Sequence, residues 1–586
     1  MSRILHFWLF AAGLLLLSAC AEKAGDIVLR NGKIYTMDER KPWGSAVVIT
    51  GNKITAVLTD ETDAERYIGA STRVIDLKGR FAVPGFIDAH VHFAGAGAML
   101  NNANLLTVSD AEGLEKEMRR VVGLLDEGEW ISGGHWGAYE QWAQGAEKAG
   151  SQTGKRWEPT RWMIDSITSA NPCLLNSFDG ALFLANTAAL RVAGLETARL
   201  PGMKVDARGR ATGLINRASE ALTILRKELQ KHPKSESRLL NESRAALKML
   251  AEYGIVEVHD ITDIAQMSRY VKLREQGELT ARIWMRVDLS RAAEFTHKGI
   301  KMGTHPVTGA PDHFLRWGAF KGYIDGIMGN HTALFFEPYD DQPNNYGRYR
   351  VHTSDDPEFK TGNMEKMYGY LKIAHQGGFV ANVHAIGDKG VALMLDTYER
   401  LMKDIGESLE GYRVIHAQVI RPEDFVRFKK LRVIAEVNPY HVADDMRWME
   451  ERIGHERCKG AYAFKSLLDN GAILTFGSDW AGSGAADYYN HPRYLLHAAV
   501  TRTTINRTPE GGWFPEQKIS MHEALKAYTI NAAYATFEQD IKGSITEGKL
   551  ADLTVLDQNL MEIDPMDILK TNVEMTIVDG RIVFEK

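Results

Sequence analysis

The strongest constraint on the fold is an alternation of short apolar runs and longer helix-forming segments through the middle of the chain. Each run is short enough to be a buried strand, and residues 364–376 are one of the helix-forming segments between them. This order is typical of a parallel α/β domain, and eight such strands predict a (β/α)₈ TIM barrel. The expected strands are residues 82–89, 255–259, 283–287, 317–321, 379–384, 412–416, 433–437 and 473–478.

The two ends of the chain have a different pattern, in which short β-rich runs are joined by tight-turn pairs. Asn31-Gly32 separates two such runs near the start, and Asp579-Gly580 separates two near the end. Neither end contains enough strands to bury a core alone. We therefore expect residues 21–80 and 541–586 to assemble into one small β-sandwich, with the barrel formed by residues 81–540.

One interval between the expected strands is far too long to be a connecting loop. It covers residues 94–234, approximately, lies between the first and second strands, and is rich in glycine and tryptophan. Structureless loops of more than about 15 residues are uncommon inside compact domains. The interval therefore predicts a subdomain inserted after the first strand of the barrel.

Composition excludes some classes of function. The 586-residue chain has a formal net charge of −6 and no excess of lysine and arginine, which argues against a nucleic-acid partner. Apart from Cys20, the cysteines are Cys173 and Cys458, far apart and without a Cys-x-x-Cys pair, so a thiolate metal site is excluded. Two buried free thiols are the preferred interpretation, and a disulfide between them is the alternative.

The first twenty residues have the pattern of an export signal. Arg3 gives a positive start, residues 7–17 form an apolar run, and Leu17-Ser18-Ala19-Cys20 follows. The run is shorter than the roughly 20 residues that a membrane-spanning helix needs. Its ending resembles the lipobox of bacterial lipoproteins, in which the cysteine becomes the lipidated N-terminus. With Ala21 next, the resemblance implies a lipid-anchored protein facing the periplasm on the outer membrane of a Gram-negative bacterium. An ordinary signal peptide with an incidental cysteine is the alternative.

Four histidines and one aspartate stand at the expected carboxyl ends of four barrel strands, the face where the chemistry of such barrels gathers. Side chains two apart on a strand point the same way, so His90 and His92 share one face. Imidazole and carboxylate groups suit Zn²⁺ and its neighbours Mn²⁺ and Fe²⁺. Any one of these histidines alone would more often be structural, but the set predicts a metal site. Its members are His90, His92, His384, His416 and Asp479.

Several longer motifs carry a family resemblance. Residues 83–92, with the sequence VPGFIDAHVH, resemble the first-strand signature of the amidohydrolase superfamily. Further motifs are similar to the YtcJ-like branch of amidohydrolase family 3, and the resemblance covers nearly everything after residue 25. These motifs are WISGGHW at 130–136, KGYIDG at 321–326, HAIGD at 384–388, IHAQ at 415–418 and GSD at 477–479.

The resemblance implies a divalent metal centre with one or two ions, most simply Zn²⁺. His90 and His92 would bind the more buried ion, and His384 and His416 the more exposed one. Lys321 matches a lysine that is carbamylated in related enzymes, where the new carboxylate bridges two cations. Only a neutral amine takes up CO₂, and nearby cations favour that form. The alternative is an ordinary lysine in a site with one ion.

The same resemblance implies the chemistry. Asp479 would bind metal and act as general base, so Asp479 and Lys321 are the predicted catalytic residues. The expected reaction is hydrolysis of a non-peptide C–N bond, in a linear or cyclic amide, N-acyl or formamide group, by metal-activated water. Hydrolytic deamination of a ring on the same scaffold is one alternative. A non-catalytic lipoprotein that binds a solute or a metal is another.

Contacts with the small-molecule substrate are harder to predict. His135 and Trp136 in the insert and His331 after the fourth strand are candidates, with core packing as the alternative for the first two and a loop role for the third. Related enzymes often have glutamate where this chain has Ile415 and histidine where it has Ala181. Both departures predict altered contacts around the metal or the substrate.

Substituting Cys20 tests the export prediction. In a Gram-negative host the wild-type chain should incorporate labelled palmitate and sediment with membranes. Cys20→Ser should lose both properties, because no acyl chain can be attached and acyl chains provide the anchor. Cys173→Ser, which leaves the lipobox intact, is the matched control. Label retained by Cys20→Ser would contradict lipidation at this residue.

Overall fold

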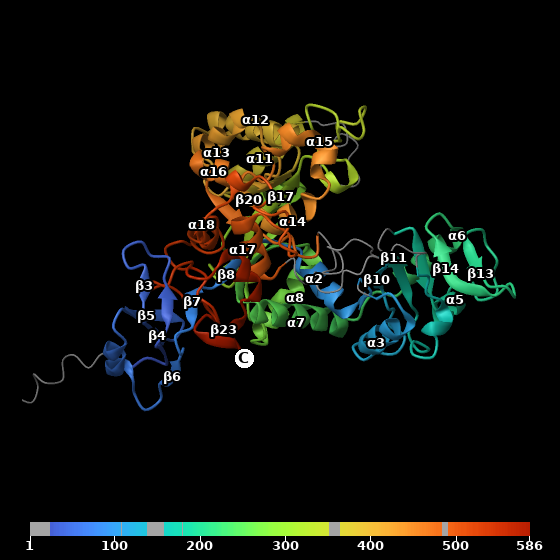
Figure 1. The fold of residues 1–586 in the computed structure, drawn as a ribbon, viewed down its shortest axis with the longest axis horizontal. Helices are drawn as coiled ribbons and strands as arrows, with labels where there is room; N and C mark the ends of the chain where they lie inside the picture. The colour runs from blue at the N-terminus through green and yellow to red at the C-terminus, as the bar shows by residue number, and fades with distance from the viewer. Residues whose placement is uncertain (1–23, 107, 138–156, 178–179, 351–363, 483–489) are drawn as a thin grey trace, which may run out of the picture.

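The computed structural model describes residues 24–106, 108–137, 157–177, 180–350, 364–482 and 490–586. The expected leader and Cys20 lie outside the described residues. Within the described part, no helix combines the length and apolar character needed to cross a membrane. Figure 1 shows the barrel in the middle of the molecule, with the N-terminal strands (blue) at one end and an inserted lobe (cyan and teal) at the other.

The barrel is a sheet of eight parallel strands in the order β8-β15-β16-β17-β18-β19-β20-β21. A parallel bridge between Val91 and Trp480 and a hydrogen bond of 2.8 Å from the Asp479 N–H to the His90 carbonyl join its two edges. The predicted (β/α)₈ barrel is therefore confirmed. Its strands are β8 (Phe86–Val91), β15 (Ile255–Ile261), β16 (Arg282–Asp288), β17 (Leu315–Tyr323), β18 (Ala381–Ala385), β19 (Arg413–His416), β20 (Ile434–Val437) and β21 (Leu474–Phe476).

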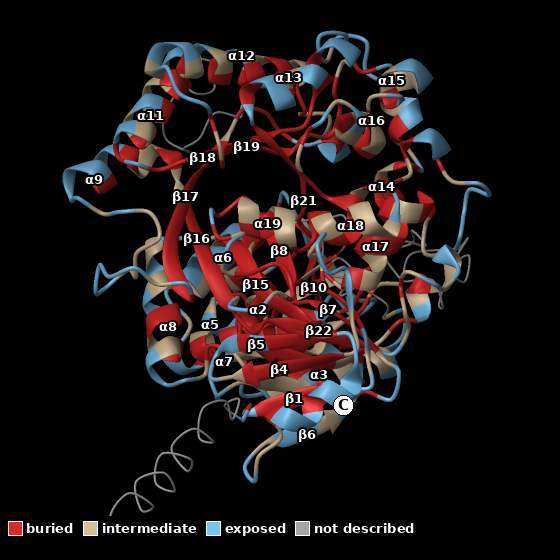
Figure 2. Ribbon diagram, turned by 90° about the vertical axis from the view of Figure 1, so that its left-hand side faces the viewer, coloured by how far each residue is buried: buried red, intermediate tan, exposed pale blue. Residues whose placement is uncertain are grey.

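Helices cover the outside of the barrel, as Figure 2 shows by their buried inner faces and exposed outer faces. Helix α12 (Asp388–Ile405) is typical, since Leu395, Tyr398 and Leu401 point toward the strands and are fully buried. It ends at Gly406, whose left-handed backbone (φ 74°) favours glycine. Other covering helices are α7 (Glu236–Glu252), α8 (Ile264–Glu275), α11 (Met364–Gln376), α13 (Phe425–Leu431), α16 (Phe464–Asp469) and α17 (Pro492–Thr501). Helix α14 (Pro439–Asp445), which has no exposed residue, follows the carboxyl end of β20.

The prediction of one continuous first strand over residues 82–89 is wrong. The chain forms two strands on either side of Gly85, and only β8 belongs to the barrel, whereas β7 (Phe81–Pro84) joins another sheet. A side chain at residue 85 would place its Cβ only 2.2 Å from Val256 Cγ1. Glycine is therefore required where the chain passes from one sheet to the other.

Both ends of the chain build the β-sandwich, as the sequence predicts. One sheet has the order β5-β4-β1-β6, and the other, β24-β23-β22-β7-β2-β3, combines strands from both ends. Ile34 and Val47 share one buried cluster with Leu553 and Ile577, so both ends of the chain contribute to one core. The strands are β1 (Ile27–Arg30), β2 (Lys33–Tyr35), β3 (Trp43–Gly44), β4 (Ala46–Thr50), β5 (Lys53–Leu58), β6 (Arg73–Asp76), β22 (Leu553–Leu556), β23 (Val573–Val578) and β24 (Arg581–Glu585).

The inserted subdomain is also present, and it has a six-stranded sheet of its own in the order β13-β14-β12-β11-β10-β9. Its apolar cores are separate from that of the barrel. Cys173 lies in one of these cores and Cys458 on α15 (Met449–Cys458), and both thiols are buried and unpaired. The strands are β9 (Ala103–Asn104), β10 (Gly133–Trp136), β11 (Leu174–Ser177), β12 (Leu182–Ala185), β13 (Met203–Val205) and β14 (Ala211–Asn216).

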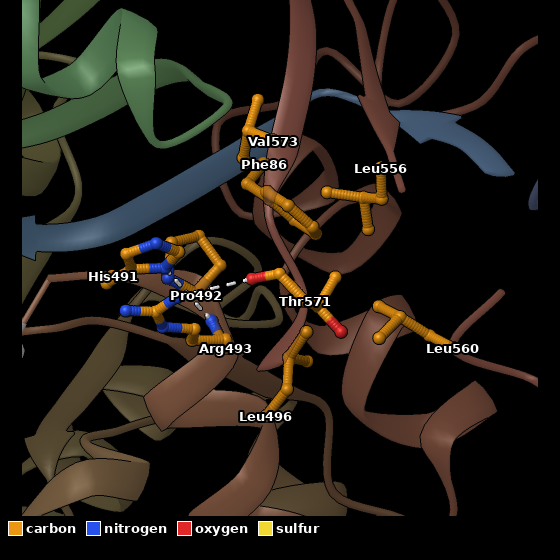
Figure 3. A pocket seen from close by; sticks show the side chains of 9 residues that line it. All are labelled: Phe86, His491, Pro492, Arg493, Leu496, Leu556, Leu560, Thr571 and Val573. Atoms are coloured by element: carbon orange, nitrogen blue, oxygen red, sulfur yellow. Dashed lines mark hydrogen bonds between the residues drawn. The ribbon is translucent and has the colours of Figure 1, made fainter. Parts of the chain in front are cut away.

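A tightly packed seam joins α17 to the C-terminal strands (Figure 3). Phe86, Leu496 and Val573 line it, and an Arg493 guanidinium nitrogen donates a hydrogen bond of 3.5 Å to the Thr571 carbonyl. The remaining cavity is about 10 Å³, which is no larger than a single water requires. This seam therefore holds the two domains together and offers no room for a ligand.

Candidate metal centre

Three predicted ligands meet where the first and last barrel strands end. His90 lies on β8, His92 follows it, and Asp479 follows β21. Asp479 Oδ1 lies 3.4 Å from His90 Nε2 and 3.2 Å from His92 Nε2. The donor atoms of all three residues lie within 4.8 Å of one another, a spacing that suits one metal ion.

The backbone around Asp479 holds its carboxylate against these histidines. Asp479 has a left-handed backbone (φ 56°), and its N–H is bonded to the His90 carbonyl. The next turn brings Gly482 so close that a Cβ there would lie 2.4 Å from Asp479 Oδ1. The closure of the barrel therefore also positions the predicted base.

A second group of donors contains a histidine that the sequence analysis missed. His416 at the end of β19, His441 on α14 and Asp479 also have donor atoms within 4.8 Å of one another. His441 Nε2 lies 4.0 Å from Asp479 Oδ2, so the two oxygens of this carboxylate face different histidines. The available signal was that His441 follows the seventh strand by only a few residues.

His384 lies beside this second group. Its ring centre is 4.5 Å from that of His416. Its Nε2–H donates a hydrogen bond of 2.9 Å to the Gly326 carbonyl. Nδ1 is then the ring nitrogen whose lone pair can bind a metal. The structure thus brings together all five residues that the strand-end pattern predicted.

Two polar residues behind the site fix the orientation of the histidines. The His90 Nδ1–H donates to Glu436 Oε1 at 2.7 Å, and the His416 Nδ1–H donates to Asn438 Oδ1 at 2.6 Å. Both Nε2 atoms are then left with their lone pairs, as is usual for histidines that bind metal. The residues present therefore fit a divalent cation. Sequence reasoning found neither Glu436 nor Asn438.

Lys321 lies on β17, is only 2% exposed, and has its Nζ 4.7 Å from the centre of the Tyr323 ring. Burial and then the charge of Arg286 lower the pKa of Lys321 to about 7, so much of it is a neutral amine at neutral pH. Burial and then the Lys321 charge hold the pKa of His90 and of His384 well below the ordinary value. The charge of Lys321 therefore acts on one histidine of each pair.

Comparison with known proteins agrees with this geometry. The model of the amidohydrolase family matches residues 73–584. The chain belongs to the amidohydrolase family. This confirms the family predicted from the motifs and makes the protein a hydrolase.

Similar proteins match this amidohydrolase over nearly its whole length. Protein LONG AFTER FAR-RED 3 of Arabidopsis thaliana is 30% identical over 95% of this chain and 91% of its own. The putative amidohydrolase YtcJ of Bacillus subtilis is 27% identical (95% and 99%), and the N-substituted formamide deformylase of Arthrobacter pascens is 23% identical (96% and 98%). The crystal structure of an uncharacterized metal-dependent hydrolase from Pyrococcus furiosus superposes with a TM-score of 0.68 and 25% identity, covering 92% of this chain and 100% of that one.

The three candidate substrate residues of this amidohydrolase lie on two segments, strand β10 of the insert and the segment after β17. Trp136 is fully buried in the core of the inserted subdomain, which favours the packing alternative. His135 is half-buried next to it on β10, with Nδ1 3.4 Å from the Asn176 amide. His331 Nε2 lies 2.7 Å from Asp341 Oδ2 in the segment after β17.

Replacing Asn438 tests whether it holds His416 for metal binding. Asn438→Ala should weaken zinc binding about 10- to 100-fold, because His416 loses the acceptor that fixes its tautomer and ring orientation. Competition with a chromophoric chelator measures the affinity. Asn470→Ala is the matched control, since the Asn470 amide caps a carbonyl on an outer helix. Unchanged zinc affinity in Asn438→Ala would contradict this role.

Proposed function

We propose that this amidohydrolase uses one or two divalent metal ions, most simply Zn²⁺, to hydrolyse an amide-like C–N bond outside peptides. The observation that carries the proposal is the position of Asp479 between two groups of histidines at the barrel mouth. The bonds from His90 to Glu436 and from His416 to Asn438 support it, because they present Nε2 lone pairs toward one space. The name of the formamide deformylase relative suggests formamides among the bonds to test.

The donor set suggests how two ions would be held. His90, His92 and Asp479 would hold one, and His416 with His384 the other. Lys321 would bridge them as a carbamate, since two cations about 3.5–4 Å apart need shared anionic oxygens to offset their repulsion. A bound metal polarises the carbonyl of an amide and lowers the pKa of water at the site.

The protein groups then handle the proton. Asp479 Oδ1 faces His90 and His92, and the Asp479 carboxylate would accept a proton from the attacking water. Asp479 would return that proton to the leaving nitrogen, so that amide and water become a carboxylic acid and an amine. His441, 4.0 Å from Oδ2, is placed to contact the groups that react there.

A substrate panel tests the proposed function. Purified protein of measured metal content should release amine from at least one of a set of N-acyl amino acids, formamides and cyclic amides, and not from a dipeptide. Chelation should remove the activity and Zn²⁺ should restore it. Asp479→Asn should lower kcat at least about 100-fold, because the general base is lost. Turnover that survives chelation and Asp479→Asn would exclude this mechanism.

The Lys321→Ala variant tests whether the centre holds one metal ion or two. It should lower the metal content from two ions to one or none per chain and remove most activity, and short carboxylic acids should restore part by replacing the bridge. Elemental analysis and turnover measure these effects. Lys372→Ala, at an exposed position on α11, is the control. Two bound ions and full activity in Lys321→Ala would contradict the bridging carbamate, whereas one ion per chain in both the wild-type protein and the variant would leave the single-metal site.

A further inference from the structure

An exposed arginine stands at the mouth of the site, next to the strand that carries Lys321. The backbone N–H of Arg350 donates a hydrogen bond of 3.0 Å to the Ile324 carbonyl, and Tyr349 forms an antiparallel β-bridge with Asp325. These backbone contacts fix Arg350 to the carboxyl end of β17. The backbone of Arg350 is therefore held in place by contacts with the barrel.

The ring of Tyr323 links this arginine to the candidate metal centre. The Arg350 guanidinium carbon lies 4.6 Å from the centre of the ring, and Lys321 Nζ lies 4.7 Å from the same centre. The centre of the Tyr323 ring also lies 5.4 Å from the centre of the His384 ring. The guanidinium and a predicted metal ligand thus lie next to the same aromatic ring.

The charge of Arg350 also reaches the site. Burial and then Lys321 lower the pKa of His384 most, and Arg350 lowers it further. The buried arginines Arg286 and Arg413 both pair with Glu436, whereas no carboxylate of the described residues forms an ion pair with Arg350. A guanidinium that lies over an aromatic ring can still donate hydrogen bonds from its N–H groups to an anion.

We propose that Arg350 forms an anion-binding subsite of this amidohydrolase and that the substrate carries a carboxylate close to the amide bond that is cleaved. This rests on the proposed function. A single planar guanidinium matches a carboxylate through two parallel hydrogen bonds. The subsite therefore selects anionic amides and holds the carboxylate outward while the amide faces Asp479.

Matched pairs of probes test the subsite on either side of the amide. N-formylglycine and N-formylglycinamide differ only by a carboxylate on the amine side, and succinamate and succinamide differ by one on the acyl side. The wild-type, metal-loaded enzyme should favour the charged member of one pair by about 10- to 100-fold in kcat/KM and in binding affinity, the size expected for a hydrogen-bonded charge. Arg350→Gln should lose this preference through weaker use of the charged probe alone.

Arg348→Gln is the matched control, because Arg348 is an exposed arginine two residues earlier in the same segment. It should keep the wild-type preference. Metal content should be equal in all three proteins, and a loss of metal in Arg350→Gln would overturn the proposal by showing an effect on the metal centre. A wild-type enzyme without charge preference, or a preference retained in Arg350→Gln, would overturn it too. If no probe is hydrolysed, the proposed function fails, while calorimetric binding of the same pairs still decides the subsite.

Discussion

The site depends on one buried carboxylate, Glu436, which lies between two arginines and a histidine. Burial alone would raise its pKa, but Arg286, His90 and Arg413 hold it well below the ordinary value, so it stays charged. It accepts hydrogen bonds of 2.7 to 2.9 Å from all three. Removing one member of such a network typically costs about 3–5 kcal/mol, because a buried charge is left unpaired. The interaction that balances charge inside the barrel is thus also the one that orients a metal ligand.

The contact that closes the barrel also brings two of the predicted metal ligands together. The strands that bear His90 and Asp479 are the first and the last, and the bond between the Asp479 N–H and the His90 carbonyl joins them. Below the barrel, Arg282 on β16 forms a buried ion pair with Asp552, just before β22 of the sandwich. The C-terminal strands therefore support the barrel that carries the site, although they contribute no residue to it among those described.

Sequence alone predicted the parts of this structure that follow a local period. Apolar runs predicted the eight strands, and the four histidines and one aspartate at the strand ends are five of the residues around the centre. Gly85 was missed as a boundary because the residues on both sides of it are buried, so the apolar run is continuous across two sheets. Glu436 was missed for a related reason. The role of a single charged residue within an apolar strand can be predicted only when its partners are known, and Arg286 and Arg413 are distant from Glu436 in sequence.

Lys321 and Arg350 show how burial assigns different roles to two cations that share one aromatic ring. Lys321 and Tyr323 are two apart on β17, so their side chains lie on the same face of the strand. The buried amine, whose pKa falls to about 7, loses its charge readily. Arg350 is exposed to solvent, and a guanidinium is a delocalised cation that forms paired hydrogen bonds with carboxylates. Lys321, which loses its charge readily, thus lies beside the metal ligands, and the cationic Arg350 lies at the mouth of the site. This arrangement favours an anionic substrate that enters with its amide group toward the metal ligands.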